Sequence, residues 1–132
     1  MAHPLVYLHF PGTARAALEF YQNVFGGELQ LYTFSDFSRD DGPGEAIAHG
    51  VLSGTVELAG ADVAGDEQPV KTEGLMLSLL GTAEPEVLHR WFEQLAADGE
   101  AVDPLQIRPW GGTDGQVVDR FGLRWLIGYE PE

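Results

Sequence analysis

The sequence predicts an α+β fold of two βαβββ modules, which form a cupped mixed sheet with the helices on its outer face. Three observations carry this prediction. The chain has 132 residues, enough for about one domain and too few for two independent cores. An amphipathic helix pattern occurs twice, each time after one strand-like run and before three others. The strands that follow the helices begin near Glu28 and Glu100, 72 residues apart, as in an internal repeat.

The first module is expected over about residues 1–62. A strand at 6–10 ends at Pro11-Gly12, and a helix with Thr13 as its N-cap follows. The helix is indicated by apolar positions at steps of three and four, namely Ala14, Ala17, Leu18, Tyr21 and Phe25, and it stops at Gly26-Gly27. Three further strands are expected at 28–34, 46–52 and 55–61, with a polar, mobile loop at 35–44.

The second module is expected over about residues 73–132, after an acidic joint. A strand at 74–80 precedes a helix that Glu84-Pro85 opens and Asp98-Gly99 ends. Its apolar stripe consists of Leu88, Trp91, Phe92, Leu95 and Ala96, and three strands follow at 101–108, 116–119 and 123–129. Each module alone buries too little, so we expect one domain over 1–132 whose concave sheet face is free for a ligand.

Composition and charge exclude several partners. Seven basic residues against 21 acidic ones give a net charge of −14, and Lys71 is the single lysine. A chain without a basic stripe does not suit nucleic acid or anionic membranes. Absence of cysteine removes disulfides and thiolate chemistry. No apolar run reaches the ~18 residues that span a bilayer, so we expect a cytoplasmic protein.

Four stretches carry a family resemblance: Tyr7 to Gly12, Ala16 to Gly27, Ile47-Ala48-His49, and Trp110-Gly111 through Asp119-Arg120-Phe121-Gly122 to Trp125. They resemble the vicinal oxygen chelate superfamily of glyoxalase I, bleomycin-resistance proteins and extradiol dioxygenases, in particular its PhnB-like branch. The resemblance implies a glyoxalase-like domain of paired βαβββ modules, an open cupped sheet, and a homodimer. The Asp119 to Gly122 segment is itself typical of a turn in which Asp119 accepts nearby backbone N–H groups.

Metal-dependent members of that superfamily place ligands on the first and last strands of each module. His9 and Glu57 match such positions in the first module, as an incomplete metal-binding pair. The corresponding runs of the second module, 75–79 and 124–128, hold no His or Glu. A chelating mechanism needs about three protein ligands. We therefore expect no resident cofactor and less than one tightly bound metal per chain, with a divalent metal kept as the alternative.

His49 and His9 are the candidate catalytic or ligand-contacting residues, because imidazole binds, titrates and donates near neutral pH. The alternative for His49 is a histidine of the core, hydrogen-bonded to backbone. It is expected to share a strand face with Ile47 and Val51. The candidate pocket residues are Tyr32, Phe34, Arg108, Trp110 and Trp125. The alternatives are that the aromatic residues fill the core and that Arg108 pairs within the protein.

Two functions remain open. One is a protein that binds a small molecule in the sheet cup, with the histidines on the concave side beside Trp110 or Trp125. The other is a divalent-metal-dependent lyase or dioxygenase acting on a small substrate with vicinal oxygens. The incomplete metal set favours the first.

Overall fold

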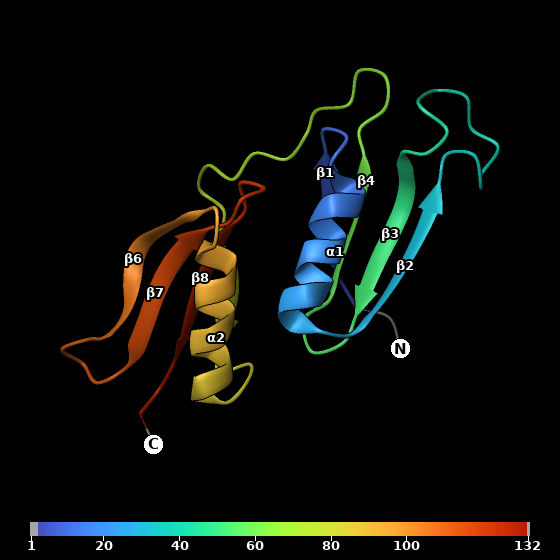
Figure 1. Cartoon of the computed structure of the whole chain (residues 1–132). Coiled ribbons are helices and arrows are strands. Elements are labelled where there is room, and N and C mark those ends of the chain that lie inside the picture. The colour runs from blue at the N-terminus through green and yellow to red at the C-terminus, as the bar shows by residue number, and fades with distance from the viewer. Residues whose placement is uncertain (1–2, 132) are drawn as a thin grey trace. The chain divides into compact units, whose positions relative to one another are not determined.

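The computed structural model describes residues 3–131 and confirms the α+β class: two four-stranded mixed sheets, each with one helix (Figure 1). The chain divides after Val70 into two compact units. Neither helix in the described part is long and apolar enough to cross a membrane. The elements of the first unit are β1 (Tyr7–Phe10), α1 (Ala14–Phe25), β2 (Glu28–Thr33), β3 (Ile47–Ser53) and β4 (Leu58–Asp62). Those of the second are β5 (Leu77–Leu80), α2 (Pro85–Ala96), β6 (Glu100–Ile107), β7 (Thr113–Val118) and β8 (Arg124–Tyr129).

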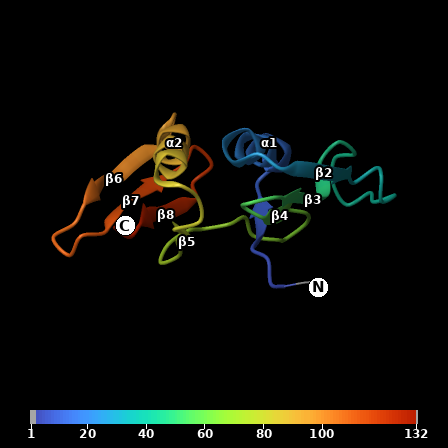
Figure 2. The ribbon, with the colours of Figure 1, turned by 90° about the horizontal axis from the view of Figure 1, so that it is seen from below.

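Both sheets have the same topology. The first has the order β1-β4-β3-β2 and the second β5-β8-β7-β6, with a parallel pair at one edge and antiparallel pairs elsewhere. In each unit the helix packs on one face of its own sheet (Figure 2). The repeated order of elements confirms the expected internal repeat.

Alternation along the strands determines which side chains face the helix. In β1, Leu8 and Phe10 are buried, whereas Tyr7 and His9 point to the opposite side. Gly50 of β3 also lies on the helix side, because a Cβ there would come within 2.6 Å of Leu18 Cδ1. We call the side opposite the helix the open face of each sheet.

The helix α1 begins differently from expectation. Thr13 occupies the N-cap position, but its side chain makes no capping hydrogen bond. Instead Asp62, at the end of β4, accepts the Ala14 N–H at 2.9 Å and the Ile47 N–H at 2.9 Å. One buried carboxylate thus joins the helix start to the start of β3, and its charge suits the positive end of the helix dipole.

Three strands begin about three residues from their expected starts. The strand β5 begins at Leu77 rather than 74, because residues 73–74 form a turn in which the Leu75 N–H donates to the Thr72 carbonyl at 3.3 Å. The strand β4 begins at Leu58 rather than near 55, because residues 54–56 form a bend. The strand β7 begins at Thr113 rather than 116. The turn before it closes with a hydrogen bond from Arg108 N–H to the Gly112 carbonyl at 2.7 Å, so pairing with β8 starts at once.

Candidate functional site

The open face of the first sheet carries a group of aromatic rings around His49. The Tyr7 hydroxyl lies 2.9 Å from His49 Nδ1. The His49 ring stacks with Tyr7 at a centroid distance of 5.7 Å and with Tyr32 at 6.3 Å. His9 meets the edge of Tyr7 at 5.9 Å, and Phe37 stacks on Tyr32 at 5.7 Å. We call these five residues the imidazole cluster.

Three strands and one loop supply the imidazole cluster. Tyr7 and His9 alternate on β1, while Tyr32 and His49 are direct partners across β2 and β3. Phe37 comes from the turns that follow β2, where its N–H bonds to the Thr33 and Phe34 carbonyls. Sequence reasoning missed Tyr7 and Phe37 as site residues. The signal for Phe37 in the sequence was an aromatic residue within the polar segment 35–44. In the structure this side chain is exposed.

The polar atoms of the cluster are arranged so that one imidazole nitrogen is held and the other is available. Within residues 3–131, His49 Nε2 makes no hydrogen bond, since Tyr7 engages only Nδ1. Partial burial, and then the negative charge of Glu67, raise the pKa of Tyr7, while Arg39 acts in the opposite direction. Tyr7 is therefore a neutral hydroxyl at physiological pH and fixes the imidazole without competing for Nε2.

Phe34 does not line this face, contrary to expectation. The pairing of β2 with β3 shifts register between Tyr32 and Thr33, so that Tyr32 pairs with His49 but Thr33 pairs with Ile47. The extra residue of this bulge is Ala48 of β3, so the bulge reverses the alternation of β3 side chains beyond it. Ile47 is therefore buried in the core and does not share the face of His49 and Val51. Phe34 lies just after the end of β2, in a turn, and is fully buried there: the Arg39 guanidinium lies 4.1 Å from its ring centroid, and a Cβ at Gly42 would come within 2.5 Å of the ring.

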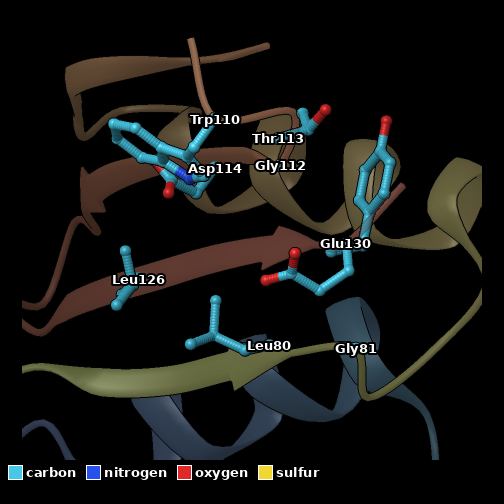
Figure 3. Close-up of a pocket in the computed structure, with 9 residues that line it drawn as sticks. Leu80, Gly81, Trp110, Gly112, Thr113, Asp114, Leu126 and Glu130 are labelled. Atoms are coloured by element: carbon cyan, nitrogen blue, oxygen red, sulfur yellow. The ribbon is translucent and has the colours of Figure 1, made fainter. Parts of the chain in front are cut away.

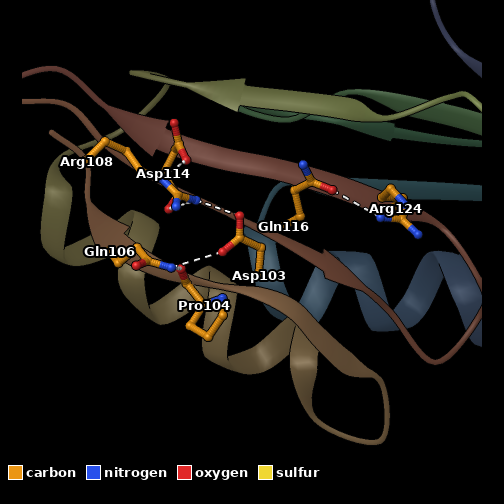
Figure 4. Close-up of polar contacts among 7 residues, drawn as sticks. All are labelled: Asp103, Pro104, Gln106, Arg108, Asp114, Gln116 and Arg124. Carbon is orange, nitrogen blue, oxygen red and sulfur yellow. Dashed lines mark hydrogen bonds and ion pairs between the residues drawn. The ribbon is translucent and has the colours of Figure 1, made fainter. Parts of the chain in front are cut away.

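The open face of the second sheet is polar at its β6 side (Figure 4). Arg108 donates from Nε to Asp114 Oδ1 at 2.8 Å and from Nη2 to Asp103 Oδ2 at 2.7 Å. These carboxylates raise the pKa of the guanidinium. Arg108 is thus paired within the protein, as the alternative interpretation held. Further along, Arg124 donates to the Gln116 amide oxygen at 3.0 Å.

Trp125 is a core residue, so the expectation that it lines a pocket is wrong. It alternates with Arg124 and Leu126 on β8 and points under α2, where it is 1% exposed. Its indole N–H donates to Asp119 Oδ2 at 2.9 Å. Asp119 Oδ1 accepts the N–H groups of Phe121 and Leu123 at 2.8 and 3.1 Å, which confirms the predicted turn.

Trp110 borders a cavity of about 270 Å³ within the second unit (Figure 3). The residues that line it are Leu80, Gly81, Trp110, Gly112, Thr113, Asp114, Leu126, Tyr129 and Glu130. Trp110 is 71% exposed and follows β6 in the turn that Arg108 and Gly112 close. The cavity and the imidazole cluster belong to different units.

The model of the Glyoxalase/Bleomycin resistance protein/Dioxygenase superfamily matches residues 6–127. The chain belongs to this superfamily. The protein YjdN of Escherichia coli K12 is 32% identical over 139 residues, covering 92% of this chain and 90% of that protein. Protein PA1353 from Pseudomonas aeruginosa superposes with a TM-score of 0.83 at 27% identity, with complete coverage of both chains. The PhnB protein from Bacillus cereus shares the fold, with a TM-score of 0.77 at 21% identity over 97% of this chain and 99% of that one.

A metal ion held by His9 and Glu57 was the alternative that the sequence left open, and the structure shows how far apart these two residues lie. His9 is level with Ala61 of β4, and Glu57 lies four residues earlier, which separates their backbones by about 13 Å along the strand. Glu57 instead pairs with His3 Nε2 at 2.9 Å. No three His, Asp or Glu side chains among residues 3–131 form a group that could hold a metal. His9 and Glu57 therefore do not fit a shared metal ion within this chain.

Proposed function

We propose that this superfamily member binds a small molecule through the imidazole cluster, without a metal ion. The observation that carries the proposal is the arrangement at His49 on the open face: Nδ1 lies 2.9 Å from the Tyr7 hydroxyl, and Nε2 has no hydrogen-bond partner among the described residues. A ring oriented in this way supplies a directed hydrogen bond to a ligand.

The neighbouring rings indicate a flat ligand. Tyr7 and Tyr32 are exposed by 47% and 38%, and both stack with the imidazole, as Phe37 does with Tyr32. Exposed aromatic surface next to a polar atom is typical of binding sites, because it buries apolar area while one polar group fixes orientation. The preferred ligand is therefore an aromatic or otherwise planar molecule with an oxygen that Nε2 can meet.

Replacing His49 by alanine is expected to raise the Kd of such a ligand by about tenfold. The variant loses the hydrogen bond from the imidazole and the stacking of its ring, which together contribute about 1.4 kcal/mol to binding. Benzamide and benzoate are suitable probes, since each joins a flat ring to a carbonyl oxygen. Their affinities can be measured by NMR titration, and thermal unfolding should change little because His49 is on the open face.

His89→Ala is the matched control, since His89 also contacts a tyrosine hydroxyl, Tyr129 at 2.9 Å, but lies on α2. This variant should bind both probes as the parent does. Equal affinities for the parent and the His49→Ala protein, or unfolding of the His49→Ala protein, would mean that His49 is structural.

Protein purified without chelator is expected to carry substantially less than one divalent metal ion per chain after dialysis. The reason is the separation of His9 from Glu57, which leaves no set of about three ligands among residues 3–131. Metal analysis by mass spectrometry, with the oligomeric mass measured on the same sample, tests this and the homodimer that we also propose. Stoichiometric zinc, nickel or iron would instead favour a metal-dependent lyase or dioxygenase.

A further inference from the structure

The cavity of the second unit has walls of two kinds. Leu80 and Leu126 form an apolar floor on β5 and β8, and the indole of Trp110 stands opposite them (Figure 3). The Glu130 carboxylate points into the space between the two walls. An apolar body placed there would contact leucine and indole, while its polar end would meet a carboxylate.

The charges around this cavity are negative. None of its nine lining residues is basic, and two of them are acidic. Asp114 shares the guanidinium of Arg108 with Asp103, so that one positive charge faces two carboxylates. Glu130 has no hydrogen bond or ion pair with any residue in the described part of the chain. The local field therefore favours a cation, and the net charge of −14 adds to it at long range.

Trp110 adds a second interaction that favours a cation in this cavity. Trp110 is 71% exposed although tryptophan is costly to leave in water, and the backbone turn from Arg108 to Gly112 holds it at the cavity edge. The face of an indole attracts ammonium groups through its quadrupole, and the attraction grows when water is displaced. The Glu130 carboxylate adds a separate attraction between opposite charges. Indole and carboxylate together select a positively charged group attached to an apolar body.

We propose that this cavity binds a small organic cation, with the ammonium group between Trp110 and Glu130 and the apolar part against Leu80 and Leu126. The cavity of about 270 Å³ suits a ligand of roughly one aromatic ring and an ammonium head. The cavity is built by residues of the second unit alone, whereas the imidazole cluster belongs to the first unit and includes no carboxylate.

Benzyltrimethylammonium is the direct probe, with benzyl alcohol and benzoate as neutral and anionic counterparts. An NMR titration in low salt should show saturable shifts of the Trp110 indole N–H for the cation. Benzyl alcohol should bind about tenfold more weakly, benzoate more weakly still, and added salt should reduce only the cation's affinity.

Two variants distinguish a site that binds cations from a cavity that binds only through apolar contacts. Glu130→Gln and Trp110→Leu should each weaken benzyltrimethylammonium by about tenfold, whereas Glu100→Gln, on the exposed start of β6, should leave it unchanged. His49→Ala should also have no effect, so failure here is separable from failure of the proposed function. The inference is overturned if Glu130→Gln binds the cation as well as the parent, if benzyl alcohol binds equally, or if the Trp110 signal does not move.

Discussion

The Asp119→Ala variant is expected to lose about 3–5 kcal/mol of unfolding free energy, the largest effect of any single change considered for the second unit. Its carboxylate, 3% exposed, accepts three hydrogen bonds: two from the β7–β8 turn and one from the Trp125 indole. Alanine removes the carboxylate to which the buried indole N–H donates. Chemical denaturation measures the loss, which corresponds to a fall in Tm of about 10–15 °C.

Glu93→Ala is the control in the same unit, because Glu93 is an exposed carboxylate on the surface of α2. A change below about 0.5 kcal/mol is expected there. Asp119→Asn should remain destabilising, since an amide has one acceptor oxygen where the carboxylate uses two. If Asp119→Ala is as stable as the Glu93→Ala control, the turn and the indole do not depend on this carboxylate.

The Asp62→Ala variant should cost about 2–4 kcal/mol, because it removes the acceptor of two buried N–H groups and the negative charge at the start of α1. The effect has a local signature. Hydrogen exchange at the Ala14 and Ile47 amides should accelerate more than exchange elsewhere in the first sheet.

Asp66→Ala, an exposed change four residues further along the chain, serves as the control and should leave stability within about 0.5 kcal/mol. Asp62→Asn is informative for a second reason. Its amide group would direct a donor at one of the two N–H groups, so it should lose nearly as much as alanine does. Unchanged exchange at Ala14 in either Asp62 variant would contradict the assignment of Asp62 as the cap of α1.

The sequence predicted the features whose causes are local. The apolar stripe at steps of three and four located both helices, and the repeated order of elements predicted two βαβββ units. The role of Asp119 in stabilising the turn was predicted, because the N–H groups that donate to its carboxylate are only two and four residues away. The cap of α1 could not be found in this way, since Asp62 lies 48 residues from Ala14.

Site residues were harder to predict. Alternation along a strand separates its side chains into two faces, but the sequence of the strand does not determine which face packs against the helix. Trp125 and Trp110 look equivalent in sequence, yet one is in the core and the other is exposed. Phe34 was expected to continue the face of Tyr32, but β2 ends at Thr33 and the loop that follows buries the ring against Arg39 and Gly42. Ile47 leaves the face of His49 because of the bulge at Ala48. A bulge depends on the pairing of two strands, which one strand's sequence does not reveal.

Metal-free binding at the imidazole cluster can be tested directly by mapping where a planar probe binds on protein treated with a chelator. Two-dimensional amide NMR spectra, recorded with increasing benzamide after dialysis against EDTA, report which residues respond. We expect saturable shifts around Tyr7, Tyr32, Phe37 and His49. In the His49→Ala protein these shifts should be lost while the rest of the spectrum is preserved. Shifts that centre away from this face, or binding that begins only when a divalent metal is added back, would contradict metal-free recognition by the imidazole cluster.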